Sequence, residues 1–141
     1  MILSFYLESL GFRDDCANDT ERKKLLVLIV EDDSDIRTLA ATCFEAWGHI
    51  VISAESGEEG LRILRDGGPI DLLFTDIVMP GTVNGLELAD WAAKRYPAMR
   101  ILLTSGYIAD PAARRLPFLP KPYLPNMLSA AVERIRQSQA A

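Results

Sequence analysis

Five short apolar runs occur along this 141-residue chain, and four of them end in residues that can do chemistry. Glu31 and Asp32 follow the first run, Asp76 the third, Ser105 the fourth and Lys121 the last. Short apolar runs bounded by turn residues are typical of strands buried on both faces. In an open parallel sheet, the carboxyl ends of the strands form the edge where ligands bind. We therefore expect these five side chains to converge on one pocket.

Three carboxylates at one edge of a sheet require compensation. Two unit charges 4 Å apart repel by ~4 kcal/mol at an effective dielectric constant of ~20. Either the carboxyl pKa values rise or a divalent cation binds among them. A cluster of hard oxygen ligands with few neutral donors suits Mg²⁺. We expect Asp76 to contact this ion and, intermittently, a phosphoryl group.

The apolar runs alternate with segments of helical periodicity, and these elements position the polar residues. We expect strands at 25–30, 50–52, 70–75, 101–104 and 118–120. We expect helices from Ser34 to Gly48, from the capping box Ser56-Gly57-Glu58-Glu59 to Gly67, from about Leu86 to before Pro97, and from Pro125 onward. This alternation predicts a doubly wound α/β fold with parallel strands and helices on both faces of the sheet. Pro120 favours an edge position for the last strand.

The composition of the chain also argues against several classes of function. The chain is long enough for one domain, and its net charge of −5 argues against nucleic acid as a direct partner. No apolar run approaches the ~20 residues that span a bilayer. Cys16 and Cys43 lack the spacing of metal ligands, which fits a reduced, cytoplasmic setting, and a single histidine, His49, leaves little room for a zinc site. We interpret residues 1–24 as a partly disordered extension outside the core.

Four motifs in order resemble the receiver domain of bacterial two-component response regulators. They are Val30-Glu31-Asp32-Asp33, Asp76-Ile77-Val78-Met79-Pro80-Gly81, Ser105-Gly106 and Lys121-Pro122-Tyr123. The resemblance covers residues 25–138 and implies a flavodoxin-like strand order of 2-1-3-4-5. It also implies a phosphorylation switch in the cytoplasm, which catalyses its own phosphoryl transfer and is not a conventional enzyme.

Carried over residue by residue, the resemblance makes Asp76 the phosphoacceptor. The donor would be a sensor histidine kinase or a histidine phosphotransfer protein, and the downstream protein partner is unknown. Asp32 and Asp76 would bind Mg²⁺, Glu31 would act through water, and the backbone carbonyl of Val78 would complete the protein's ligands.

The resemblance also assigns the residues that respond to phosphorylation. Lys121 would pair with Asp76 and then with a phosphoryl oxygen, and Ser105 would donate its hydroxyl to the phosphoryl group. Thr104 is the neighbouring candidate for that hydroxyl. Phe118 would be the aromatic switch residue whose rotamer follows Ser105. The Lys121–Pro122 peptide bond is cis in the family.

The sequence departs from the usual receiver pattern in three places. Only twelve residues separate Ser105 from Phe118, so the fourth helix is shortened to about two turns near 110–116, with Asp110 as its N-cap. The loop after Asp76 is one residue longer than is common. No output domain is expected after Ala141. The shortened segment also resembles that of receiver modules in hybrid sensor kinases, which is one alternative. A receiver that binds partners without phosphorylation is another, although the presence of Asp32, Asp76 and Lys121 argues against it.

Two other protein classes share part of the pattern. A phosphatase of the haloacid dehalogenase class also uses an aspartate nucleophile with Mg²⁺, but Asp33-Ser34-Asp35-Ile36-Arg37 ends in arginine where that class needs threonine or valine. A flavodoxin-like flavin binder would need a phosphate-binding loop after the first strand, where the acidic residues Glu31, Asp32 and Asp33 would repel a phosphate.

Overall fold

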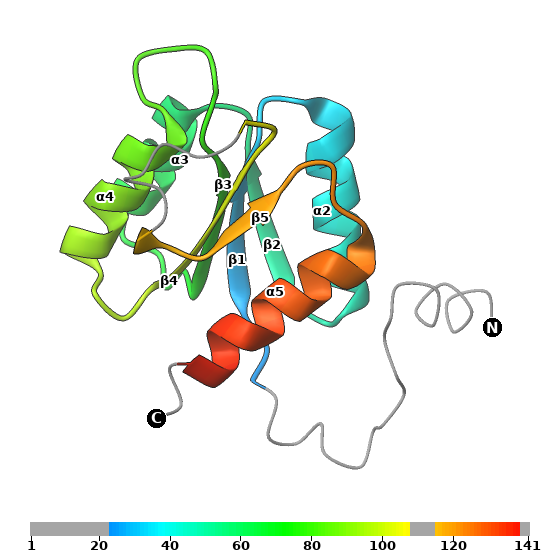
Figure 1. Ribbon diagram of the computed structural model, residues 1–141. Coiled ribbons are helices and arrows are strands. Elements are labelled where there is room, and N and C mark those ends of the chain that lie inside the picture. The colour runs from blue at the N-terminus through cyan, green and yellow to red at the C-terminus, as the bar shows by residue number, and fades with distance from the viewer. Residues whose placement is uncertain (1–22, 108–114, 139–141) are drawn as a thin grey trace.

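A five-stranded parallel sheet forms the centre of the computed structural model, which describes residues 23–107 and 115–138 (Figure 1). The strands are β1 (Leu26–Val30), β2 (Ile50–Ala54), β3 (Leu72–Asp76), β4 (Arg100–Ser105) and β5 (Phe118–Pro120). Their order across the sheet is β2-β1-β3-β4-β5, and all four pairs are parallel. The doubly wound fold, the strand order and the edge position of β5 are confirmed.

Four described helices cover the two faces of this sheet. They are α2 (Ser34–Ala46), α3 (Gly57–Arg65), α4 (Gly85–Arg95) and α5 (Pro125–Ser138). Figure 1 shows α2 and α5 on one face and α3 and α4 on the other. Two separate hydrophobic cores result, one on each face of the sheet.

The central strands serve both cores because successive side chains of a strand point to opposite faces. Val27 and Ile29 of β1 belong to the core under α2 and α5, whereas Leu28 and Val30 belong to the core under α3 and α4. A strand that is buried on both faces needs apolar residues at every position. This explains why the first run is continuous rather than alternating.

Capping side chains define where α3 and α4 begin, as Asp33 does for α2. At α3, the Ser56 hydroxyl accepts the N–H of Glu59, but the Glu59 carboxylate accepts the N–H of Glu55 rather than that of Ser56. The expected capping box is therefore displaced by one residue. A reciprocal box is present at α4, where Asn84 and Glu87 each accept the other's backbone N–H. This box fixes the end of the loop that follows β3.

Two sequence predictions lie wholly or mainly outside the described residues. These are the N-terminal extension at 1–24, of which only Lys23 and Lys24 are described, and the short helix near 110–116. The predicted cis peptide bond between Lys121 and Pro122 is present. Among the helices in the described ranges, none has the length and apolar character needed to cross a membrane.

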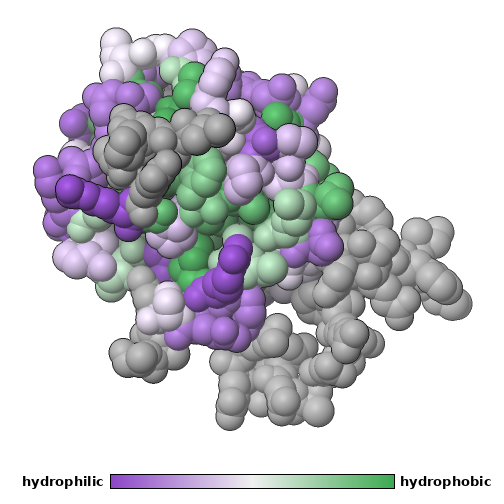
Figure 2. Space-filling model, viewed as in Figure 1, coloured by the Kyte–Doolittle hydropathy of each residue, from purple (hydrophilic) through white to green (hydrophobic). Residues whose placement is uncertain are grey.

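Apolar side chains gather in the middle of the face formed by β5 and α5, as Figure 2 shows. A groove of about 330 Å³ runs there between the edge strand and the helix. Its lining includes Leu102, Phe118, Ala131 and Ile135. This groove is separate from the acidic residues, which lie at the carboxyl ends of the strands.

Candidate functional site: an acidic cluster with one partly buried lysine

The carboxyl ends of four strands bring the predicted polar residues to one edge of the sheet. Glu31 and Asp32 follow β1, Asp76 is the last residue of β3, Ser105 is the last residue of β4, and Lys121 follows β5. One carboxylate oxygen from each of Glu31, Asp32 and Asp76 lies within 4.8 Å of the others. Glu31 and Asp76 are buried, whereas Asp32 is exposed. The sheet topology thus produces the acidic cluster that the sequence predicts.

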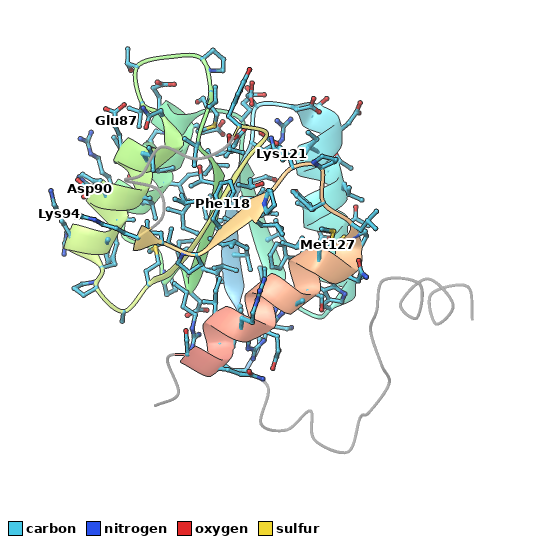
Figure 3. All side chains as sticks on the ribbon, viewed as in Figure 1. Glu87, Asp90, Lys94, Phe118, Lys121 and Met127 are labelled. Atoms are coloured by element: carbon cyan, nitrogen blue, oxygen red, sulfur yellow. The ribbon has the colours of Figure 1, made fainter. Side chains whose placement is uncertain are left out.

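Lys121 crosses from the far edge strand to bind this cluster. Its Nζ donates to Oδ2 of Asp76 at 2.9 Å and also to Oε1 of Glu31. Figure 3 shows Lys121 on the connection between β5 and α5, at the edge of the sheet. Burial alone lowers the pKa of Lys121, but the hydrogen bonds to Glu31 and Asp76 outweigh it, so the pKa lies above its usual value. The lysine is therefore a permanent positive charge between two buried carboxylates.

Burial also perturbs the other groups of the cluster. Burial and, secondly, the hydrogen bond to Asp76 raise the pKa of Glu31 to about 8, against the opposing effect of Lys121. Burial followed by the charge of Glu31 raises the pKa of the nearby Tyr123 hydroxyl. The positive charge of Lys121 alone therefore does not compensate for the burial and mutual repulsion of the carboxylates at this edge. The cluster has the electrostatic character of a cation-binding site.

The backbone around Asp76 is held tightly. Oδ1 of Asp76 accepts the N–H of Val78 at 3.2 Å, and the N–H of Ile77 donates to the Thr104 carbonyl at 2.9 Å. Gly85, the first residue of α4, lies so close that a Cβ there would be 1.9 Å from the Asp76 carbonyl oxygen. The beginning of α4 therefore packs directly on the strand end that carries Asp76.

Arg37 is a site neighbour that the sequence did not reveal. Its Nη1 donates to the Glu31 carbonyl at 2.7 Å and lies 3.5 Å from the Asp32 carbonyl. The guanidinium therefore fixes the turn between β1 and α2. The sequence places Arg37 on the first turn of the helix. An arginine at such a position is equally typical of a helix face exposed to solvent, so the sequence alone did not assign it to the site.

Ser105 lies at the site through its backbone and hydroxyl. Its carbonyl accepts the Lys121 N–H at 2.9 Å, and its Oγ accepts the Tyr107 N–H at 3.2 Å. The neighbouring Thr104 has a buried Oγ1 without a hydrogen-bond partner among the described residues. Phe118 is half-buried on β5, opposite Leu103 of β4. The switch roles of Ser105 and Phe118 stay predictions.

The donor atoms fit a hard divalent cation. Glu31, Asp32 and Asp76 offer three carboxylates, and Oε2 of Glu31 is buried with no hydrogen-bond partner in the described part of the chain. Buried polar atoms are normally satisfied, so an unpaired oxygen on a carboxylate of this cluster indicates a missing ligand. Mg²⁺ takes one or two carboxylates and keeps several waters, which suits one exposed and two buried acids. The edge can therefore hold a divalent cation beside Asp76.

Comparison with known proteins agrees with this geometry. Residues 27–133 match the family described as the response regulator receiver domain. The chain is 34% identical over 120 residues to the sensor kinase CckA of Brucella abortus, a match that covers 80% of this chain and 13% of that protein. It is 35% identical over 83 residues to the response regulator receiver protein CpdR of the same species, which covers 59% of this chain and 68% of CpdR.

The chain thus spans a small part of some relatives. It also spans 34% of the transcriptional regulatory protein AfsQ1 of Streptomyces coelicolor, with 38% identity over 79 residues that make up 56% of this chain.

Solved structures share the fold. The receiver domain of the hybrid histidine kinase CckA superposes with a TM-score of 0.67 at 34% identity, covering 78% of this chain and 97% of that one. The response regulator TrrA of Thermotoga maritima, solved in complex with Mg²⁺-BeF, gives a TM-score of 0.71 at 29% identity, covering 80% of this chain and 99% of that one.

Proposed function

Because the chain belongs to the family of response regulator receiver domains, we propose that it accepts a phosphoryl group on Asp76. The donor is the phosphohistidine of a sensor histidine kinase or of a histidine phosphotransfer protein. The observation that carries this proposal is a buried aspartate at the end of β3, bound by Lys121 and surrounded by two further acids. The functional unit is the domain at 25–138, acting in the cytoplasm.

Magnesium is the cofactor that the donor set fits best. Asp32 and Asp76 would hold the ion directly and Glu31 would act through a water molecule. The backbone carbonyl of Val78 would complete the protein's ligands. When bound, Mg²⁺ neutralises the negative charge of the carboxylates and of the incoming phosphate. The relative TrrA, solved with Mg²⁺-BeF, supports this choice of ion.

The chain's own residues place the nucleophile and stabilise the product. A carboxylate oxygen of Asp76 forms a bond to phosphorus while the bond between phosphorus and the histidine nitrogen breaks, and the nitrogen keeps the electron pair. Lys121, already bound to Oδ2 of Asp76, then pairs with a phosphoryl oxygen as a compact positive charge. Ser105 releases the Tyr107 N–H and donates its hydroxyl to the phosphoryl group.

The output is a shift between two conformations. Ser105 moves toward the phosphate, Phe118 follows it, and the surface near β5 changes its affinity for a protein partner. A complete switch from 1:99 to 99:1 requires about 5.5 kcal/mol of differential stabilisation. Charge-assisted hydrogen bonds to the phosphoryl group contribute about 1.5–3 kcal/mol each. Two or three such bonds therefore supply most of the required energy.

Phosphorylation by a small donor tests the proposal. Wild-type protein, Asp76→Asn and Asp90→Asn are incubated with Mg²⁺ and acetyl phosphate, and intact mass is measured. Asp90 is a matched control because it is an exposed aspartate on α4 whose partner is the exposed Lys94. We expect one added phosphoryl group on the wild type and on Asp90→Asn, and none on Asp76→Asn. Labelling of Asp76→Asn would place the acceptor elsewhere, and an unlabelled wild type would favour a receiver that binds without phosphorylation.

A further inference from the structure

Glu58, on the first turn of α3, binds the loop that follows Asp76. Its Oε1 accepts the backbone N–H of Thr82 at 2.6 Å, the backbone N–H of Val83 at 2.7 Å and the Thr82 hydroxyl at 3.0 Å. The same carboxylate packs on Gly81, where a Cβ would lie 2.7 Å from Oε1. Gly81 has a φ of +111°, a conformation that glycine adopts without strain. One exposed carboxylate thus organises three successive loop residues.

This loop is also held at its two ends and by the side chain of Met79, which is buried in the core under α3 and α4. At one end, the Val78 N–H binds Oδ1 of Asp76, and at the other end Asn84 caps α4. Gly57 adds a steric contact, since a Cβ there would lie 2.0 Å from the Val83 carbonyl oxygen. Between these ends, the residues from Val78 to Val83 lie outside any helix or strand. The Glu58 contacts are the hydrogen bonds that the structure gives to the middle of the loop.

We propose that Glu58 is a positioning residue for the magnesium site, acting through the loop at 78–83 to hold the Val78 carbonyl toward the acidic cluster. This inference rests on the proposed function, in which that carbonyl is a metal ligand. The loop carries no helix or strand between Val78 and Val83, and the Glu58 contacts act on its second half. A carboxylate that accepts two successive backbone N–H groups selects one path among those available.

The electrostatics of Glu58 agree with this role. The backbone N–H of Val83, followed by further hydrogen bonds including that from Thr82, holds the pKa of Glu58 below its usual value. The side chain is therefore ionised at neutral pH and accepts all three hydrogen bonds in its charged form. Residues that orient the ligands of a metal, without touching it, alter metal affinity by about 10-fold to 100-fold when they are removed.

Binding of Mn²⁺, a paramagnetic substitute for Mg²⁺, tests the inference without any phosphoryl transfer. The dissociation constant of Mn²⁺ is measured by electron paramagnetic resonance of the free ion for wild type, Glu58→Ala, Glu58→Gln and Glu55→Ala. Glu55 is the matched control because it is an exposed glutamate just before α3, so its removal subtracts the same charge near the same edge. Thermal unfolding in EDTA is recorded for every variant.

We expect Glu58→Ala to weaken Mn²⁺ binding by about 10-fold. Glu58→Gln keeps an oxygen acceptor for the loop and should recover most of the affinity, whereas Glu55→Ala should stay within about twofold of the wild type because exposed charges are screened. Equal affinities of Glu58→Ala and Glu55→Ala, or a lower melting temperature without weaker binding, would overturn the role of Glu58 alone. A wild type that fails to bind Mn²⁺ would overturn the proposed function and this inference with it.

Discussion

Lys121 offsets the charge of two buried carboxylates. The lysine side chain is 16% exposed, and the side chains of Glu31 and Asp76 are 4% and 7% exposed. Removing one partner of a buried ion pair leaves the other charge without compensation, which costs about 3–5 kcal/mol in well-buried cases. Here the raised pKa of Glu31 allows its carboxyl group to take up a proton, which relieves part of that cost.

We therefore expect Lys121→Met to lower the free energy of unfolding by about 2–4 kcal/mol in metal-free buffer, measured by urea denaturation. Lys94→Met is the control, because Lys94 pairs with Asp90 on the solvent side of α4, where both side chains are more than half exposed (Figure 3). That substitution should cost less than about 0.5 kcal/mol. Equal costs for the two variants would mean that the partly buried Lys121 contributes no more than a surface ion pair.

His49 gives the fold a pH dependence at a point remote from the acidic cluster. Its Nδ1 accepts the Leu25 N–H at 3.0 Å, just before β1 begins. Burial, followed by the positive charges of Arg136 and Lys24, lowers the pKa of His49 from 6.5 to about 4. The folded protein therefore excludes a proton that the unfolded chain binds as the pH falls below 6.5.

Because the pKa of His49 is lower in the folded protein than in the unfolded chain, the stability of the fold decreases as the pH falls. Above pH 6.5 the imidazole is neutral in both states, and its full contribution to stability is present. Between pH 6.5 and about 4 that contribution is lost progressively, by about 1–2 kcal/mol once partial exposure is taken into account. We expect the stability difference between wild type and His49→Asn, measured by urea denaturation, to shrink by this amount between about pH 7.5 and about pH 4.5. A constant difference across that range would contradict the lowered pKa.

At the scale of elements, the close packing of α4 on the end of β3 requires glycine at position 85, because there is no room for a Cβ atom. A Cβ on Gly85 would lie 1.9 Å from the Asp76 carbonyl oxygen, a contact with backbone that cannot rotate away. Alanine is a better helix former than glycine by about 1 kcal/mol, but the clash displaces α4 from the strand end and outweighs this gain.

We expect Gly85→Ala to lower the free energy of unfolding by about 1–3 kcal/mol and to weaken Mn²⁺ binding, because the strand end that carries Asp76 shifts. Gly68→Ala is the control, since no atom lies within 4 Å of a Cβ at that exposed turn. It should leave both the unfolding midpoint and the Mn²⁺ affinity unchanged. Wild-type stability of Gly85→Ala would show that α4 can move away without cost.

The elements that the sequence predicted best are those with a clear hydrophobic pattern. Continuous apolar runs predicted β1 and β3, and the topology of a parallel sheet then placed Glu31, Asp76 and Lys121 at the same edge. Boundaries were less accurate: β2 continues to Ala54, two residues beyond the predicted strand, because pairing with β1 extends past the apolar run.

Contacts between a side chain and a distant backbone had no such signature. Glu58 binds residues 24 and 25 positions away, and Arg37 binds the turn before its own helix. The pairing of Lys121 with Glu31, in addition to Asp76, was likewise not predicted, because topology sets which strand ends are neighbours and not which rotamers meet. The sequence motifs therefore predicted which residues form the site, whereas the contacts that hold those residues in place were found only in the structure.

At the scale of the whole molecule, the two cores share the same strands. Leu128 of α5 is fully buried in the core beneath α2 and α5, and Leu88 of α4 is fully buried in the core beneath α3 and α4. Alternate residues of β1 and β3 contribute to each core. Loss of one helical layer would expose apolar strand residues and weaken the sheet on which the other layer packs. Unfolding should therefore be a single cooperative transition.

The two tryptophans provide one probe for each core. Trp47 packs against the core under α2 and α5, and Trp91 packs against the core under α3 and α4. Trp47→Phe and Trp91→Phe leave one fluorophore each, and we expect both to report the same urea midpoint after correction for the substitution. Leu128→Ala should lower the free energy of unfolding by about 2–5 kcal/mol.

The decisive comparison is the effect of Leu128→Ala on the distant probe. Because the cavity lies in one core and Trp91 lies on the other, a cooperative fold moves the Trp91 transition by as much as the Trp47 transition. A Trp91 transition that stays in place while the Trp47 transition moves would mean that the α3–α4 layer and the sheet survive the loss of α5. The proposed phosphorylation switch would then be expected to act mainly within one layer, because coupling between distant sites is carried by packed elements that respond together.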